Sequence, residues 1–75
     1  MDVIASVFQE ILGLEPQEIT DDLAYETCDR WDSLKHLEIV SALESRFGIA
    51  VEIDDILAME SVGRTREIIR TYGVL

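Results

Sequence analysis

The sequence predicts an all-α fold, a small four-helix bundle with three longer helices and one short helix. Three observations predict it. The chain has 75 residues, which suits a single domain over residues 1–75 with one core. Apolar residues recur every three or four positions in three segments, each bounded by residues that begin or end helices. The strand-like residues 49–53 have no second strand to pair with, so we interpret them as an extended connector.

The first helix is predicted over about residues 2–13. Asp2 can cap its start and Gly13 can close its end. Its apolar stripe consists of Val3, Ile4, Val7, Phe8, Ile11 and Leu12. Residues 14–31 are expected to form a loop that wraps the bundle and includes a short helical turn after Thr20, because Pro16 interrupts any longer first helix.

The second helix is predicted over about residues 33–47. Either Asp32 or Ser33 can be its N-cap, and Gly48 follows its last apolar residue at the position that glycine prefers. Its predicted buried stripe consists of Leu34, Leu37, Val40, Leu43 and Phe47.

Two more helices complete the predicted bundle. A short one, about residues 55–59, starts from Asp54 or Asp55, and a last one, about residues 62–72, is capped by Ser61. The stripe of the last helix is Val62, Thr65, Ile68, Ile69 and Tyr72. Gly63 is expected to weaken that helix by up to about 1 kcal/mol relative to alanine. An apolar seam between the second and third helices is predicted from Ile53, Ile56, Leu57 and Met59, facing Leu37 and Val40.

The charge excludes two classes of partner. The net charge is −10, and residues 1–29 contain no Lys or Arg. Nucleic acid and anionic membrane both require a positive surface, so neither is an expected partner. No apolar stretch is long enough to span a membrane. The single cysteine cannot form an internal disulfide and the N-terminus lacks a basic signal segment, so we expect a cytoplasmic protein. We also expect a monomer.

Ser33 is the candidate site residue. A helix start places free backbone N–H groups and a partial positive charge beside its hydroxyl, which favours an attached phosphate. Asp32 is next to it and can orient the hydroxyl or a metal bound by a modifying enzyme. The alternative interpretation of this dipeptide is an ordinary helix cap.

The residues from Trp31 to Ile49 extend this pattern. Asp-Ser-Leu at residues 32–34 is followed in phase by helical aliphatics, then by Ala-Leu-Glu at 42–44 and by Phe47. This stretch resembles the second-helix signature of acyl carrier proteins. The rest of the chain is also similar to that family, which has an acidic four-helix bundle, a long first loop and a short third helix.

The resemblance implies a 4'-phosphopantetheine arm on Ser33, next to Asp32 and Leu34. It also implies that the seam between the second and third helices serves both as core and as a partial pocket for the attached chain. A phosphopantetheinyl transferase would move the arm from coenzyme A with the help of magnesium. The arm would carry acyl or aminoacyl cargo as a thioester from a loading enzyme to synthase or transferase enzymes of fatty-acid, polyketide or related specialised biosynthesis. The carrier itself would catalyse nothing, and no metal site is expected in it.

The resemblance also implies a face that contacts partner enzymes. Its predicted residues are Lys35, Leu37, Glu38, Ser41, Glu44 and Ile53. Carriers of fatty-acid synthesis typically have an acid where Lys35 stands, small residues where Arg30 and Trp31 stand, and often a methionine where Ser41 stands. The Trp-Asp-Ser-Leu form resembles free-standing carriers of specialised polyketide, hybrid peptide or aminoacyl pathways.

Two other functions remain open from the residues alone. One is a small acidic protein-interaction domain that is never modified. The other is a small enzyme or metal binder that uses Cys28 and His36, although a single histidine supports no metal site and no oxyanion hole is evident. Lys35 and His36 are interpreted as surface residues, tolerated or selecting a partner, and Trp31 as a packing residue or an anchor for a partner. Tyr25 is interpreted as a residue at the edge of the core.

Overall fold

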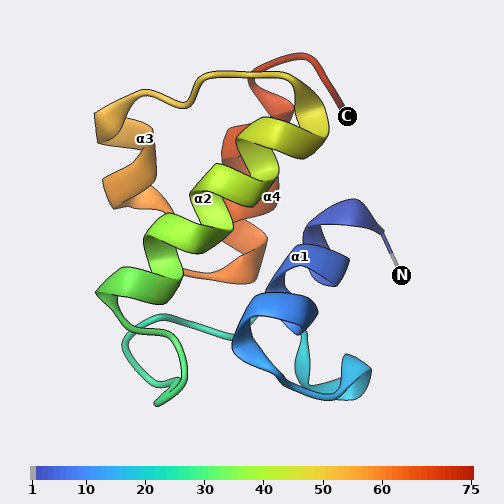
Figure 1. The fold of residues 1–75 in the computed structure, drawn as a ribbon, viewed down its shortest axis with the longest axis vertical. Helices are drawn as coiled ribbons and strands as arrows, with labels where there is room; N and C mark the ends of the chain where they lie inside the picture. The colour runs from blue at the N-terminus through green and yellow to red at the C-terminus, as the bar shows by residue number, and fades with distance from the viewer. Residues whose placement is uncertain (1) are drawn as a thin grey trace.

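A computed structural model describes residues 2–75 and places four α-helices in them, with one short 3₁₀ helix and no strand. The helices are α1 (Val3–Leu12), α2 (Ser33–Phe47), α3 (Ile53–Ala58) and α4 (Val62–Arg70). The predicted bundle of three longer helices and one short helix is confirmed. Helix α1 packs against α2 and α4, and α3 packs against α4 (Figure 1). No helix of residues 2–75 combines the length and the apolar character that crossing a membrane requires.

The ends of α1 and α2 follow the predicted capping chemistry. Asp2 caps α1 by accepting the Ala5 N–H at 2.8 Å, and Asp32 caps α2 by accepting the Lys35 N–H at 2.9 Å. Both helices end at a glycine with positive φ, 68° at Gly13 and 65° at Gly48, where a side chain would be strained. The two possible N-caps of α2 are thereby resolved in favour of Asp32.

Helix α3 begins earlier than predicted. It starts at Ile53 after the N-cap Glu52, so the prediction that Asp54 or Asp55 begins a helix at 55–59 is wrong by two residues at the start. Both aspartates lie in the first turn instead, where their negative charges are favourable beside the positive end of the helix dipole. The extended connector is therefore residues 49–52.

Helix α4 ends two residues before its predicted end, at Arg70, and Tyr72 lies in the turn that follows. Ser61 caps it as predicted, by accepting the Arg64 N–H at 3.0 Å. The Tyr72 hydroxyl donates to Asp55 at 2.6 Å and accepts the Glu52 N–H at 3.0 Å. The C-terminal turn thus holds the start of α3 in place.

The loop between α1 and α2 is pinned at several points. Its short helix is a 3₁₀ turn over Pro16–Glu18, which lies earlier than the helical turn predicted after Thr20. After Thr20 itself, the chain forms a single hydrogen-bonded turn. Ile19 is buried, and an isolated antiparallel bridge joins Ala24 to Ser61. The loop therefore runs along the start of α4, in agreement with the prediction that it wraps the bundle.

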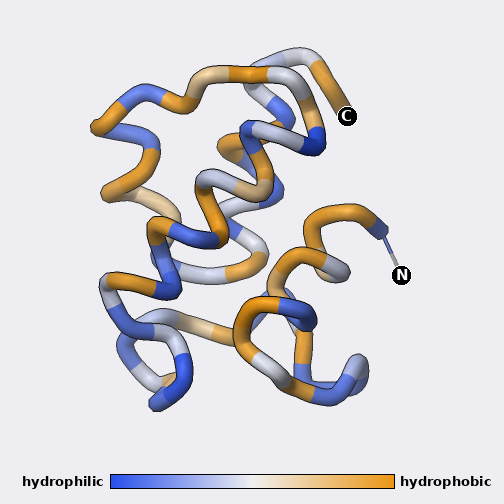
Figure 2. The backbone as a smooth tube through the Cα atoms, in the orientation of Figure 1, coloured by the Kyte–Doolittle hydropathy of each residue, from blue (hydrophilic) through white to orange (hydrophobic). Residues whose placement is uncertain are grey.

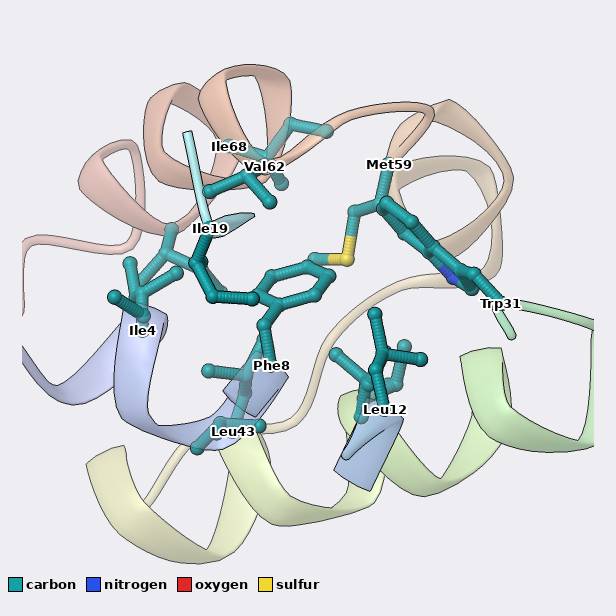
Figure 3. Close-up of a cluster of buried hydrophobic side chains, with 14 of the residues drawn as sticks. Ile4, Phe8, Leu12, Ile19, Trp31, Leu43, Met59, Val62 and Ile68 are labelled. Atoms are coloured by element: carbon teal, nitrogen blue, oxygen red, sulfur yellow. The ribbon is translucent and has the colours of Figure 1, made fainter. Parts of the chain in front are cut away.

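The core lies between α1, α2 and α4 and is closed at one end by Trp31. Figure 3 shows Phe8 at its centre, with Met59 and Trp31 to one side. The Phe8 and Trp31 rings meet edge to face with their centroids 4.9 Å apart, a favourable aromatic geometry. Trp31 is 2% exposed, which confirms it as a packing residue.

Two of the five residues in the stripe predicted for α2 are exposed. Leu34 is 67% exposed and Leu37 is 58% exposed, whereas Ile39, Val40 and Leu43 form the buried face. Ile53 and Leu57 of α3 are each 73% exposed, so the interpretation of the seam between α2 and α3 as core is wrong for Leu37, Ile53 and Leu57. Ile56 of α3 packs against the core, and Met59, which follows the helix, is buried in it. Figure 2 shows hydrophobic and hydrophilic stretches alternating along α2 and α3.

Candidate functional site

The site is built at the N-terminus of α2. Because the Asp32 carboxylate caps the helix, the hydroxyl of Ser33, the first helical residue, has no capping bond to make. Ser33 is exposed. The first bond within α2 joins the His36 N–H to the Asp32 carbonyl at 2.8 Å, so the N–H groups of Ser33 and Leu34 have no partner inside the helix. The hydroxyl is accessible at the end of a helix where negative charge is favourable.

Trp31 fixes the loop at this helix end. Its indole Nε1–H donates to Nδ1 of His36 at 3.0 Å, and the two rings stack with centroids 5.9 Å apart. Nε2 of His36 lies 2.8 Å from the Ile56 carbonyl oxygen of α3. His36 is half-buried and joined to two segments, so the interpretation of this residue as a surface residue is wrong.

Tyr25 approaches Ser33 from the loop. Its hydroxyl lies 3.3 Å from Ser33 Oγ, within hydrogen-bond distance. The ring meets Trp31 and His36 edge to face, with centroids 6.0 and 5.9 Å away. Sequence reasoning placed Tyr25 at the edge of the core and missed this contact. No spacing rule joins residues eight positions apart across a loop, so only the folded loop reveals it.

Ser33 lines an open groove. It runs between α2, α3, the loop and α4. Its apolar lining near Ser33 comes from Leu37, Ile56, Leu57 and Met59. The exposed leucines of α2 and α3 therefore border a surface depression next to the serine hydroxyl.

Some of the predicted partner-facing residues have contacts within the protein. Leu37, Ser41 and Ile53 are exposed, and Lys35 forms an ion pair with the exposed Glu38 at 3.5 Å. Their positions suit a surface shared by α2 and α3.

The Glu44 carboxylate has an internal partner. It accepts the Val51 N–H at 2.8 Å, so Glu44 fastens the connector that leads to α3. Its side chain is partly buried, unlike that of Glu38.

Arg30 has a structural role. Its guanidinium donates to the Gly13 carbonyl at 2.9 Å and to the Leu12 carbonyl at 3.4 Å. These carbonyls end α1 and lack partners inside that helix. A cation at the negative end of the helix dipole also stabilises α1.

Cys28 and His36 do not form the alternative catalytic or metal site. Cys28 is half-buried, and both nitrogens of the His36 ring are engaged with Trp31 and Ile56. No nitrogen is left on that ring to activate a thiol. Across residues 2–75, no three side chains of His, Cys, Asp or Glu gather as a metal site would require.

Comparison with known proteins identifies the family of the chain. Residues 2–69 match the family model described as a phosphopantetheine attachment site. An acyl carrier protein of Saccharopolyspora erythraea is 35% identical over 65 residues, which cover 87% of this chain and 68% of the relative. An acyl carrier protein of Rhodococcus erythropolis is 30% identical over 60 residues, with 80% and 66% covered.

A mycobacterial relative is longer. The meromycolate extension acyl carrier protein of Mycobacterium leprae is 32% identical over 60 residues, which cover 80% of this chain. The matched part is 52% of that relative, so the chain spans about half the length of the mycobacterial protein. The family match covers α1 to α3, the loop that carries Tyr25 and Trp31, and α4 except its last residue. The chain therefore belongs to the phosphopantetheine-attachment family of carrier proteins, and its cofactor is 4'-phosphopantetheine.

Proposed function

We propose that this protein carries acyl or aminoacyl intermediates as thioesters on a phosphopantetheine arm attached to Ser33. The observation that supports Ser33 is its exposed position at the start of α2, where its hydroxyl has no capping bond to make because Asp32 caps the helix. The residues present fit the group: the hydroxyl is accessible, the helix end favours a phosphate, and Ser33 lines an open groove.

The chemistry of attachment is a phosphoryl transfer to Ser33 Oγ. A bond forms between Oγ and the phosphorus of coenzyme A that bears the pantetheine, and the pyrophosphate bond to the adenosine 3',5'-bisphosphate leaving group breaks. The hydroxyl proton passes to the transferase or to solvent. When bound, the arm supplies a terminal thiol for the thioester, and the protein itself performs no further chemical step.

The acidic surface suits brief contacts with partner enzymes. With a net charge of −10, the protein is steered toward basic docking patches, and weak charged contacts allow rapid release. We propose that transferase, loading and downstream synthase or transferase enzymes of fatty-acid, polyketide or related biosynthesis dock on Lys35, Leu37, Glu38 and Ser41 of α2 and Ile53 of α3. Glu44 lies on the same helix, but its carboxylate already accepts a hydrogen bond from within the protein. We propose a monomer in the cytoplasm, where a reducing setting keeps the terminal thiol free.

Intact-mass spectrometry tests attachment. The protein is incubated with coenzyme A, Mg²⁺ and a broad-specificity phosphopantetheinyl transferase. We expect a gain of one phosphopantetheine in the wild type and in the control Ser45→Ala, which changes another exposed serine of α2, and no gain in Ser33→Ala. A gain that persists in Ser33→Ala would overturn the assignment of the site.

Absence of any gain with several transferases would favour the unmodified acidic interaction domain instead. Once loading is established, the cargo is identified by offering the modified protein a panel of acyl and aminoacyl donors with their loading enzymes. Thioester formation with one class of donor would assign the pathway.

A further inference from the structure

We infer that Tyr25 is a positioning residue for the arm, and that its hydroxyl donates a hydrogen bond to the phosphate attached to Ser33. The inference rests on the proposed attachment at Ser33. Its starting observation is the distance of 3.3 Å between the Tyr25 hydroxyl and Ser33 Oγ, the atom that would bond to phosphorus.

Tyr25 is held in place independently of Ser33. Its backbone N–H donates to the Glu60 carbonyl at 2.9 Å, and its neighbour Ala24 forms the bridge to Ser61. Its ring meets the rings of Trp31 and His36 edge to face. The backbone and the ring are therefore fixed before any modification, so directing the hydroxyl costs little further conformational entropy.

Modification changes what the Tyr25 hydroxyl can do. In the unmodified protein, either hydroxyl of the Tyr25–Ser33 pair can be the donor, and the distance is long for an O–H to O bond. After attachment Ser33 has no hydrogen to give, so Tyr25 must be the donor. The acceptor then belongs to a phosphodiester anion, and hydrogen bonds to charged acceptors are shorter and roughly twice as strong as neutral ones.

The phosphate needs such a donor because its neighbour is an acid. The Asp32 carboxylate adjoins Ser33 and stays at the helix end through its bond to the Lys35 N–H. The Lys35 ammonium is engaged with Glu38 at 3.5 Å. A neutral hydroxyl beside the free N–H groups of the first turn offsets the repulsion between two anions without adding charge.

The bond would also set the direction of the arm. Tyr25 and Ser33 both line the open groove, together with Leu37, Ile56 and Leu57. A phosphate held on the Tyr25 side of Ser33 starts the arm along this groove instead of into open solvent. Tyr25 thereby directs the arm from its attachment point toward the apolar lining of the groove.

Tyr25→Phe tests the inference, and Tyr72→Phe is the matched control. Tyr72 is the chain's other tyrosine, and its hydroxyl is bonded to Asp55 and Glu52. The ³¹P resonance of the loaded protein is recorded for the wild type and both variants. We expect it to shift in Tyr25→Phe and to stay at the wild-type position in Tyr72→Phe.

A thermodynamic cycle gives a second readout. The unfolding equilibrium constant is measured with and without the arm, for the wild type and for Tyr25→Phe. We expect loading to favour the folded wild type about three- to tenfold more than the folded variant, as suits one charge-assisted bond at an exposed site. Equal effects of loading, together with unchanged ³¹P positions, would overturn the inference.

A measurement on the wild type avoids any folding defect of the variant. With ¹³Cζ-labelled tyrosine, loading should shift the Tyr25 signal and leave the Tyr72 signal in place. A Tyr25 signal that does not move would refute the inference while leaving attachment at Ser33 intact. A wild type that gains no arm in the mass experiment would instead refute the proposed function, and the inference with it.

Discussion

Nε2 of His36 lies 2.8 Å from the Ile56 carbonyl oxygen, so the first turn of α2 is bonded directly to α3. The indole N–H of Trp31 can only donate, so Nδ1 of His36 must accept. Nε2 therefore carries the hydrogen and donates to Ile56. Each ring nitrogen thus has a definite hydrogen-bond role, and the ring joins the loop, α2 and α3 beside Ser33.

His36→Phe should lower the free energy of unfolding by about 1–3 kcal/mol, because it leaves the N–H of the buried Trp31 without an acceptor. Urea denaturation followed by circular dichroism measures the loss. His36→Gln, whose amide has both an acceptor and a donor, should recover part of it. Equal stability of His36→Phe and the wild type would contradict the bridging role.

Leu37→Gln should change recognition more than stability. Leu37 is 58% exposed, so the free energy of unfolding should stay within about 0.5 kcal/mol of the wild-type value. If α2 is the docking face, kcat/KM for loading by a transferase should fall at least about fivefold. Val3→Gln alters an exposed apolar residue of α1 and should leave loading unchanged. Equal loading of both variants would place the docking face elsewhere.

Asp2→Asn should destabilise the protein at neutral pH and lose its effect in acid. Partial burial opposes ionisation of Asp2, but the Ala5 N–H and Arg66 outweigh it and hold the pKa of Asp2 below 3.8. A carboxyl with a lowered pKa in the folded state stabilises above its unfolded pKa and loses that contribution as the pH falls through the folded value. Asparagine also caps helices well, so the substitution removes mainly the charge.

The Asp2 test compares urea midpoints from pH 7 downward. The gap between the wild type and Asp2→Asn should close below about pH 4. Asp22→Asn, at an exposed acid of the loop, should show a smaller gap at pH 7. A gap of constant size at every pH would exclude the ionic contribution of the contact between Asp2 and Arg66.

Gly63→Ala should destabilise the protein by about 1 kcal/mol, although alanine is the better helix former. A Cβ at this position would lie 3.1 Å from both the Cβ and the carbonyl oxygen of Asp21. That carbonyl accepts the Gly63 N–H at 3.0 Å and cannot move away without losing the bond. Thermal unfolding measures the change. Ser45→Ala, at an open helical position, should be neutral or stabilising.

Local signals were enough to predict α2. Asp32, Gly48 and the buried residues Val40 and Leu43 follow capping rules and helical spacing, and the helix begins and ends where those signals place it. The same spacing could not tell that Leu34 and Leu37 are exposed. A helical stripe becomes a buried stripe only where another element covers it, and α3 does not cover the first turns of α2.

The site was predictable only in part. A serine beside an N-cap, within the wider pattern from Trp31 to Ile49, indicated Ser33, and the structure leaves its hydroxyl exposed. The contacts of Tyr25 and His36 depend on how the loop folds back, which no periodicity encodes. Gly63 was predicted to weaken α4. In the structure, its lack of a side chain allows Asp21 to lie close to this helix.

The buried indole of Trp31 has a practical consequence. It is the chain's single tryptophan, it lies two residues from Ser33, and its N–H is bonded to the ring of His36. Excitation of one fluorophore therefore reports on the environment of the helix end where the arm would be attached. Changes at that end could be followed by intrinsic emission in real time, without an added dye.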